Sequence, residues 1–384
     1  MTTSLPQPSA EALAHSNLLV ELIRRDISAQ GGWISFAHFM ELALYAPGFG
    51  YYTAGSRKFG IEGDFITAPE LSSLFGRTLA RQLIEVMRAS SPQILECGAG
   101  SGKLALDILR ELERLGALPE QYLILEVSAD LRERQQKLIR EKLPHISARV
   151  HWLDALPETI SGAVIGNEVL DALPVHLLHW SGGRMLERGV SFFNDHFVWQ
   201  DRSPASTSLH TIGQNLKVPD DYLSEVSLAA RGLIASLIER MIKGALLFID
   251  YGFGAREYYH PQRSRGTLMC HYRHYAHDDP FYLPGLQDIT AHVDFTAIAE
   301  AAIEHGGHFL GYTSQAHFLI NNGVVNYLSE ISPDDVTAYV PLSAQLQKLT
   351  SPAEMGELFK VIALGKGMEV TLTGFKRGDL SRLL

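Results

Sequence analysis

Three glycines at alternate positions form the strongest chemical signal in the sequence. Gly98, Gly100 and Gly102 follow a short apolar run, Gln93–Cys97, and precede a helical pattern that begins at Lys103. Glycine allows the backbone to adopt positive φ and lets a ligand approach without a Cβ in the way. A strand-to-helix turn also presents free backbone N–H groups and the positive end of a helix dipole. The segment therefore predicts a binding site for a nucleoside cofactor.

The spacing of these glycines differs from the fingerprint of dinucleotide-binding proteins. Counted from Gly98, the pattern G-x-G-x-x-G needs a third glycine at position 103, where the sequence has Lys103. Glycines at alternate positions are instead typical of class I methyltransferases. A glycine-rich turn can also be only a tight connection between a strand and a helix, so the motif needs support from elsewhere in the chain.

Carboxylates follow the next two predicted strands. Glu126 ends the apolar run that begins at Tyr122, roughly 25 residues beyond the glycines and close to the ~20 expected for an acid that binds a ribose. A carboxylate at this place can accept hydrogen bonds from both ribose hydroxyls. Asp154, after the third predicted strand, is a candidate partner of an adenine ring. The alternatives are a solvated glutamate at a strand end and an ordinary turn residue.

Alternating strands and helices must position these residues. From residue 93 onward, short apolar runs alternate with helical patterns, which predicts an α/β fold: a doubly wound, mostly parallel sheet with helices on both faces. The expected strands are Gln93–Cys97, Tyr122–Val127, Arg149–Leu153, Ala163–Gly166, Leu246–Asp250 and Leu358–Leu364. The expected helices are Lys103–Leu115, Ala129–Lys142, Leu223–Ile242 and Phe295–His305.

Other segments predict additions to this sheet. Residues 1–90 contain three helical patterns and are expected to form an N-terminal helical extension with a cofactor lid. The core is expected to span 91–384, with an antiparallel β insertion at about 175–202 and a polar helical segment at about 322–350.

Four segments of the chain match a known family. They are Glu96–Gly102, Gly63–Glu70, Gly166–Val175 and Gln287–Phe295. On these motifs the chain resembles the MidA-like family of S-adenosylmethionine-dependent methyltransferases, whose mitochondrial members assist the assembly of respiratory complex I and methylate an arginine of one of its subunits. The resemblance extends from about Gly32 to the last strand. It implies a class I (Rossmann-like) methyltransferase fold, with S-adenosylmethionine bound at the three glycines and Glu126.

Three polar residues, Asn167, Glu168 and Asp171, follow the fourth predicted strand, where class I methyltransferases commonly place residues that position the acceptor. Methyl transfer is an in-line displacement at a sulfonium carbon, so the enzyme chiefly aligns the acceptor and removes a proton. Carboxylates can hold a guanidinium acceptor by paired hydrogen bonds. We hypothesise that Glu168 and Asp171 orient the acceptor while Asn167 shapes the cofactor pocket. Alternatively, Asp171 caps a short helix and Glu168 is structural.

A segment before the sheet predicts a lid. Asp64, Thr67 and Glu70 are hard to explain by packing alone, and we expect them to fold over the cofactor. A helix that starts at Thr67 or Pro69 and runs through Glu70 is compatible with this role.

Histidines gather in the segment Cys270–His277. His271, His274 and His277 are three residues apart, a spacing that could place metal ligands on one helical face. Nearby prolines favour a loop or strand, and zinc sites more often combine ligands from separated pairs, so no metal is expected. The segment is instead predicted to form, with His292, a wall of the acceptor pocket. The aromatic pairs that could line this pocket, or simply pack, are Tyr51-Tyr52 and Tyr258-Tyr259.

Composition narrows the classes of function. The 384 residues are 46% hydrophobic and 20% charged, which indicates a globular protein. Acidic residues outnumber basic ones by 43 to 33, which argues against general nucleic-acid binding. Two distant cysteines, Cys97 and Cys270, form no disulfide framework and suit a reducing compartment. No secretory signal and no apolar run of membrane-spanning length is found, so a cytoplasmic protein is expected.

Three functions remain open at this stage. The first is a methyltransferase acting on a protein, with arginine as a candidate acceptor, although small-molecule acceptors also stay open. The second is a nicotinamide-dependent oxidoreductase, which Lys103 disfavours. The third is a non-enzymatic assembly factor that keeps the cofactor as a structural ligand. Apolar segments such as Phe192-Phe193 could serve a homodimer or pack internally.

Overall fold

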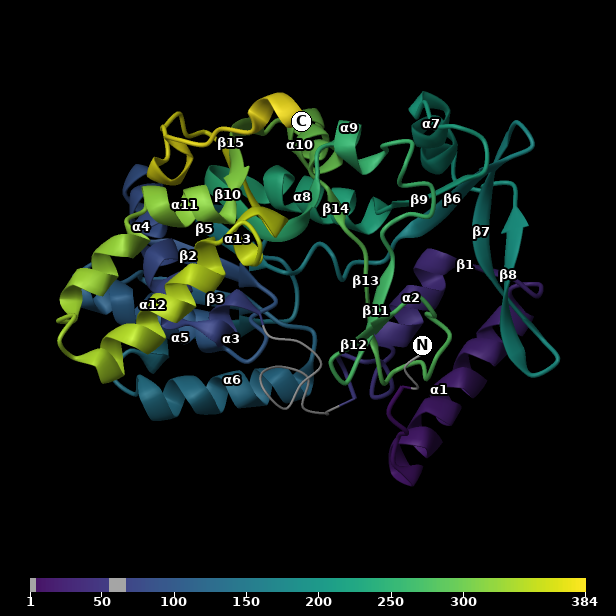
Figure 1. The fold of residues 1–384 in the computed structure, drawn as a ribbon, viewed down its shortest axis with the longest axis horizontal. Helices are drawn as coiled ribbons and strands as arrows, with labels where there is room; N and C mark the ends of the chain where they lie inside the picture. Colours follow the sequence, from purple (N-terminus) through teal and green to yellow (C-terminus); the bar gives the residue numbers. More distant parts are fainter. Residues whose placement is uncertain (1–4, 55–66) are drawn as a thin grey trace. The chain divides into compact units, whose positions relative to one another are not determined.

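A computed structural model describes residues 5–54 and 67–384 of the chain (Figure 1). The chain divides into two compact units, each assembled from three segments. Unit 1 comprises Met1–Phe65, Asp171–Gly232 and Ala255–His292. Unit 2 comprises Ile66–Leu170, Leu233–Gly254 and Val293–Leu384.

Unit 2 is built on an eight-stranded sheet, whose main path has the order β15-β16-β10-β5-β2-β3-β4, with β14 paired to β10. The strands are β2 (Gln93–Cys97), β3 (Gln121–Leu125), β4 (Val150–Leu153), β5 (Ile160–Asn167), β10 (Met241–Phe253), β14 (Val293–Asp294), β15 (His308–Ser314) and β16 (Phe359–Lys366). Neighbouring strands from β4 through β10 run parallel, whereas β16 is antiparallel to both of its neighbours. The predicted doubly wound, mostly parallel sheet is confirmed.

The strand order reverses between β2 and β5. From β2 the sheet grows through β3 and β4 on one side, and from β5 through β10 on the other. Cys97 and Gly166 are register partners at the carboxyl ends of β2 and β5. In open α/β sheets, ligands bind outside the carboxyl ends of the strands at such a switch point. The glycine turn after β2 and Asn167 at the end of β5 both lie there.

Helices cover the sheet of unit 2. They are α3 (Ala68–Leu71), α4 (Ser73–Ala89), α5 (Lys103–Arg114), α6 (Ala129–Lys142), α8 (Leu228–Arg240), which begins in unit 1, α10 (Phe295–Glu304), α11 (Gln315–Asn321), α12 (Val336–Thr350) and α13 (Met355–Leu358). Short 3-10 turns occupy Ser147–Arg149, Val324–Glu330, Thr373–Phe375 and Ser381–Leu383. In α5, Leu104, Ile108 and Leu112 recur every four residues and are buried in the same core as α4 and β2.

Within its described residues, unit 1 combines four helices with two antiparallel sheets. Its helices are α1 (Ala10–Ala29), α2 (Phe36–Tyr45), α7 (Thr207–Asn215) and α9 (Ala255–Tyr258). One sheet contains β1 (Ile34–Ser35), β6 (His176–Ser181), β7 (Arg184–Phe193), β8 (His196–Arg202) and β9 (Tyr222–Val226), and the other β11 (Met269–Tyr272), β12 (Tyr275–His277) and β13 (Asp288–Thr290). Side chains of α1, α2 and β7, among them Leu19, Phe39 and Val190, form one buried cluster.

The structure differs from the expected elements in three places. The expected helix Leu223–Ile242 is strand β9 followed by α8, because residues 222–226 pair antiparallel with β6. The expected helical segment at about 322–350 is helical but interrupted, because a 3-10 turn, Val324–Glu330, precedes α12. The compact units are also divided differently from the predicted boundary at residue 90, since α4 buries its apolar face in the core of unit 2. The β insertion forms the hairpins β6-β7-β8.

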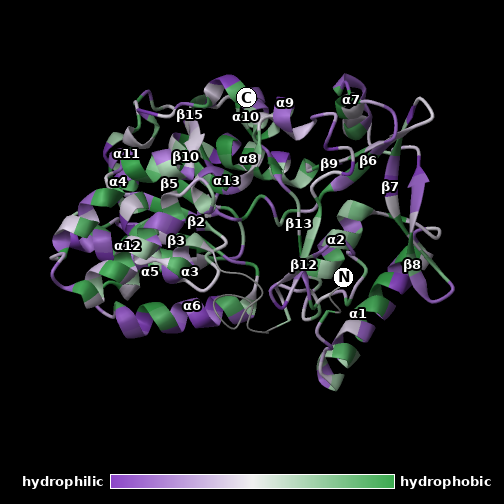
Figure 2. Cartoon of the chain, viewed as in Figure 1, coloured by the Kyte–Doolittle hydropathy of each residue, from purple (hydrophilic) through white to green (hydrophobic). Residues whose placement is uncertain are grey.

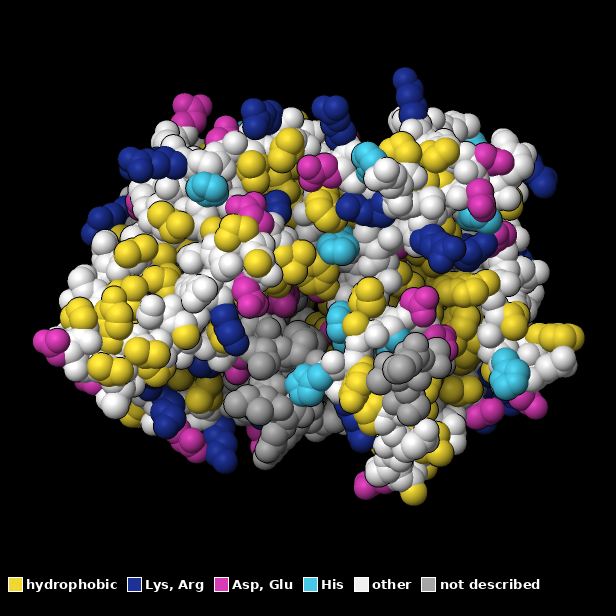
Figure 3. All heavy atoms as spheres, viewed as in Figure 1, with side chains coloured by type: hydrophobic (Ala, Val, Ile, Leu, Met, Phe, Trp, Pro, Cys, Tyr) yellow, Lys and Arg dark blue, Asp and Glu magenta, His cyan; other side chains and the backbone are white. Residues whose placement is uncertain are grey.

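Surface properties vary along the chain. Figure 2 shows α6 as a mostly hydrophilic helix, and its buried residues are limited to one stripe, Leu131, Gln135 and Ile139. On the face drawn in Figure 3, lysine and arginine side chains are scattered among acidic ones. Among the described residues, no helix combines the length and apolarity that a membrane crossing requires.

Candidate functional site

The glycine turn adopts the backbone that its composition predicts. Gly98, Gly100 and Gly102 have φ of 66°, 53° and 83°, all in the left-handed region. The Gly98 N–H donates to the carbonyl of Leu125 at 3.0 Å, which ties the turn to β3. Gly102 is the N-cap residue of α5, so the first N–H groups of that helix face the turn. The turn thus offers backbone donors at the switch point.

Glu126 follows β3 directly and is 6% exposed. Its Oε1 accepts from the N–H of Ser128 at 2.9 Å, and its Oε2 accepts from Nε2 of Gln135 at 3.0 Å. Burial raises the pKa of the Glu126 carboxyl, while these hydrogen bonds oppose the shift. A carboxylate held in this way keeps lone pairs that can accept from the hydroxyls of a ribose.

Asp154, the expected adenine partner, follows β4 on the same edge. Its side chain is 90% exposed and forms an ion pair with Arg132, whose Nη1 lies 2.7 Å from Oδ1. Nη2 of Arg132 also donates to the carbonyls of Glu126 and Leu153, at 3.1 and 2.8 Å. Arg132 therefore links the ends of β3 and β4, and Asp154 belongs to the rim of this region.

The end of β5 carries an unpaired buried acceptor. Nδ2 of Asn167 donates to Oε1 of Glu168 at 3.0 Å, but Oδ1 of Asn167 is buried and finds no hydrogen-bond donor among the described residues. Glu168 has φ of 51°, an uncommon conformation for a residue with a side chain. An orphaned buried acceptor beside a strained residue is an arrangement that a ligand donor can complete.

Asp250 holds this turn from the neighbouring strand. Its fully buried carboxylate accepts from the N–H groups of Val169 and Leu170 through Oδ2, at 3.2 and 2.9 Å. The N–H of Glu168 donates to the carbonyl of Ile249 at 2.9 Å. Sequence reasoning missed the role of Asp250, although an aspartate that ends an apolar strand is a detectable signal.

The expected lid is only partly described. Asp64 lies outside the described residues. Thr67 precedes the short helix α3, which has Pro69 in its first turn, so the compatible local helix through Glu70 is confirmed. Glu70 accepts a hydrogen bond from the hydroxyl of Ser101 in the glycine turn. Glu70 and the glycine turn are thus in contact, whereas closure over a cofactor stays a prediction.

Unit 1 contains Asp171 and His292. Asp171 is 5% exposed, and its carbonyl accepts from the N–H of Ala291 at 3.0 Å. The N–H of His292 donates to the hydroxyl of Thr267 at 3.1 Å. The described chain runs from β5 to β6 through a turn with no helix, so the alternative in which Asp171 caps a short helix is wrong.

Tyrosines and acids gather in the same part of unit 1. The hydroxyl of Tyr52 donates to Oδ1 of Asp288 at 2.9 Å, and the rings of Tyr45 and Tyr52 stack with centroids 5.4 Å apart. Asp288 is 1% exposed. Burial raises the pKa of Tyr52 well above its ordinary value, and the charges of Asp288 and Asp171 add to the shift. Two buried carboxylates and stacked aromatic rings thus share one region.

The histidine-rich segment forms strands, as its context predicts. His271 lies in β11 and His277 in β12, two strands of one antiparallel sheet. Among residues 5–54 and 67–384, no group of three or more histidine, cysteine, aspartate and glutamate side chains could hold a metal ion.

The sheet order, the left-handed glycine turn at the switch point and the buried acid after the next strand define the class of protein: a class I methyltransferase fold with a nucleoside site. The model of a family described as S-adenosyl-L-methionine-dependent methyltransferases matches residues 78–313. The chain belongs to this family, as its motifs predict. It is therefore an enzyme with S-adenosyl-L-methionine as cofactor, and the glycine turn and the orphaned Asn167 oxygen fit that group.

Named relatives and solved structures agree with this assignment. Mitochondrial protein arginine methyltransferase NDUFAF7 of Mus musculus is 30% identical, over 91% of this chain and 86% of its own length. Its homolog in Drosophila melanogaster is 29% identical, over 94% of this chain and 88% of its own. A crystal structure from Burkholderia thailandensis, bound to S-adenosyl-homocysteine, is 48% identical and matches 99% of this chain and all of that chain with a TM-score of 0.96.

Proposed function

We propose that this methyltransferase modifies an arginine side chain of a protein. The observation that carries the proposal is the pair of buried carboxylates, Asp171 and Asp288, beside the stacked rings of Tyr45 and Tyr52. A guanidinium is always charged, binds carboxylates through paired hydrogen bonds and stacks on aromatic faces. The relatives that match most of this chain are named protein arginine methyltransferases, which supports the same acceptor.

The cofactor contacts belong to the same proposal. The bound cofactor supplies an electrophilic methyl group, and the chain has to hold it and exclude water. The proposed contacts are the N–H groups around Gly98, Gly100 and Gly102, the ribose acceptor Glu126, the rim residue Asp154, the buried oxygen of Asn167, and the lid residues Asp64, Thr67 and Glu70. The unpaired Oδ1 of Asn167 supports this assignment because a cofactor donor would satisfy it.

The acceptor residues have distinct tasks in this scheme. Asp171 holds the guanidinium by charge-assisted hydrogen bonds and localises its charge. His292, anchored through its backbone to Thr267, forms a wall of the acceptor pocket. The role of Glu168 in orienting the acceptor stays a prediction. The expected cytoplasmic location, the homodimer and the lack of nucleic-acid binding also stay predictions.

Methyl incorporation tests the proposal directly. Purified enzyme and tritiated S-adenosylmethionine are incubated with protein extract from cells that lack the gene, and labelled protein is hydrolysed for amino-acid analysis. We expect the label in methylarginine. Asp171→Asn should lower incorporation by about tenfold or more, because a carboxylate partner of the guanidinium is lost. The matched control is Asp221→Asn, since the Asp221 side chain is 98% exposed. Label only in other amino acids, or in small molecules, would refute an arginine acceptor.

A further inference from the structure

Gln135 of α6 is a fully buried polar residue that connects three segments around the glycine turn. It is 0% exposed and occupies the middle of the buried stripe of α6. Its Nε2 donates to the carbonyl of Gly100 at 2.8 Å and to Oε2 of Glu126 at 3.0 Å. Its Oε1 accepts from Nε1 of Trp152 at 2.9 Å. The side chain thus joins the turn after β2, the acid after β3 and strand β4.

These partners determine the orientation of the Gln135 amide. Gly100 and Glu126 present acceptors and need the amide nitrogen, whereas the indole of Trp152 is only a donor and needs the amide oxygen. A flipped amide would lose all three bonds. Buried polar networks that are satisfied in this way are rigid and specify one arrangement.

Gln135 also packs against the third glycine of the turn, Gly102, whose φ of 83° already favours glycine. A Cβ at Gly102 would lie 3.1 Å from Cγ of Gln135 and 3.4 Å from its Cα. The glycine turn therefore packs directly on the backbone and side chain of Gln135. Gln135 thus packs against Gly102 and also donates a hydrogen bond to the carbonyl of Gly100.

The charge of Glu126 depends on the groups around it. Burial disfavours the ionised form of the Glu126 carboxyl. The charge of Glu126 in turn raises the pKa of Glu96 in β2, whose carboxyl accepts a hydrogen bond from Tyr122 of β3. Arg132 of α6, the N–H of Ser128 and the amide of Gln135 favour the ionised form. Arg132 is also ion-paired with Asp154. Gln135 is the neutral side chain among these groups that donates to the carboxylate.

We propose that Gln135 is a positioning residue for S-adenosylmethionine, which keeps Glu126 available as an ionised acceptor for the ribose and fixes the carbonyl side of the glycine turn. The inference rests on the proposed contact between Glu126 and the cofactor, and it does not depend on the identity of the methyl acceptor. Cofactor affinity near neutral pH should therefore require the Gln135 amide, even though this side chain is too buried to touch the ligand itself.

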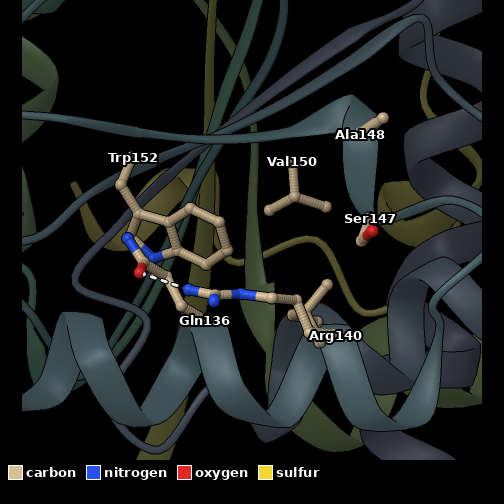
Figure 4. A pocket seen from close by; sticks show the side chains of 7 residues that line it. Gln136, Arg140, Ser147, Ala148, Val150 and Trp152 are labelled. Carbon is tan, nitrogen blue, oxygen red and sulfur yellow. Dashed lines mark hydrogen bonds between the residues drawn. The ribbon is translucent and has the colours of Figure 1, made fainter.

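The third bond of Gln135 is to Trp152 of β4, the last strand in the order of the sheet. Trp152 lines a pocket of about 340 Å³ together with Gln136, Ile139 and Arg140 (Figure 4). Gln136 lies one residue beyond Gln135 on α6 and hydrogen-bonds Arg140 at 2.7 Å, not the glycine turn. Gln136 is therefore a matched control on the same helix.

The test compares Gln135→Met with Gln136→Met in the full-length protein. Methionine has a similar volume and removes the hydrogen bonds. Affinity for S-adenosylmethionine is measured by calorimetric titration from about pH 8 to about pH 6, with thermal unfolding of the cofactor-free proteins recorded in parallel. We expect Gln135→Met to weaken binding by about tenfold at neutral pH, and the loss to grow as the pH falls, because Glu126 then takes up a proton more readily. Gln136→Met should bind like the unchanged protein.

Two further variants keep the test decisive. In Gln135→Glu, two carboxyl groups face each other near pH 8, and their repulsion should make cofactor affinity poor. Toward pH 6 the two carboxyls can share one proton. The introduced carboxyl, when protonated, can again donate a hydrogen bond to Glu126, so affinity should recover. This pH dependence is opposite to that of Gln135→Met. The glutamate variant therefore tests the proposal even if the methionine variant does not fold. Unchanged affinity, or a loss independent of pH in both Gln135 variants, would overturn the proposal. Unchanged binding by Glu126→Gln would instead show that the proposed ribose contact is wrong.

Discussion

Two glutamates, one in each unit, are both buried but differ in how many hydrogen bonds their carboxylates accept. Glu225 of unit 1 is 1% exposed, and each of its oxygens accepts from two donors: the N–H groups of Thr267 and Leu268 for Oε1, and the hydroxyls of Thr267 and Tyr258 for Oε2. Glu126 of unit 2 accepts from Ser128 and Gln135 and keeps acceptor capacity. Burial raises the pKa of both. The number of donors therefore separates a carboxylate that holds a loop from one that can still accept further hydrogen bonds.

A large loss of stability is expected from a substitution in the loop that Glu225 holds. Gly266 has φ of +76°, and a Cβ there would lie 2.1 Å from Oε1 of Glu225. Gly266→Ala should lower the free energy of unfolding by about 3 kcal/mol, since it combines left-handed strain with a clash against a buried carboxylate. The control is Gly182→Ala, with φ of +60° and no atom within 4 Å, which should cost about 1 kcal/mol. Equal losses in urea unfolding would show that Glu225 does not constrain this loop.

Exchanging the acids for amides should separate the two roles. Glu126→Gln should weaken S-adenosylmethionine binding by roughly a hundredfold, because the proposed charged acceptor of the ribose is lost, and change the unfolding free energy little. Glu225→Gln should do the reverse, with cofactor affinity within about twofold and a loss of about 2 kcal/mol in stability, because an amide nitrogen then faces N–H donors. Cofactor affinity is measured by calorimetric titration and stability by urea unfolding for both variants. The same changes in affinity and stability in the two variants would show that the two glutamates do not have different roles.

A third buried glutamate, Glu96, should make the stability of the protein depend on pH. Burial, with the charge of Glu126, raises the pKa of Glu96 to about 8 despite the hydrogen bond from Tyr122. Between about pH 4.5 and about pH 8 the folded state retains a proton that the unfolded state releases, so stability should fall as the pH rises, by up to about 1.4 kcal/mol per pH unit. Glu96→Gln should flatten this slope in unfolding measured across that range. An unchanged slope would mean that Glu96 is ionised in the folded protein.

The part of the site that could be predicted from the sequence is the part encoded locally. The glycines, the strand before them and Glu126 after the next strand lie within one short stretch, and the parallel sheet follows from alternating apolar runs. Each of these signals depends on backbone conformation or on strand periodicity, which neighbouring residues largely determine.

The missed residues act across long sequence separations. Glu225 bonds to Thr267, 42 residues away, and Val169 donates to Asp250 across 81 residues. Gln135 was detectable in principle, because a glutamine replaces an apolar residue in the buried stripe of α6. Its partners could not be read from that stripe, since the contacts depend on how β3, β4 and α6 pack. Strand β9 was likewise missed because its pairing with β6 competes with a helical pattern.

The interleaving of the two units has a consequence for synthesis on the ribosome. The chain passes between the units five times. Strand β16 lies between β10 and β15 in the sheet and is formed by residues 359–366, close to the end of the 384-residue sequence. Until those residues emerge, the facing edges of β10 and β15 lack their partner and remain open to wrong pairing. Neither unit can be obtained by trimming the chain at one point. We therefore expect slow, late-completing folding and a dependence on chaperones that a linear arrangement of domains would avoid.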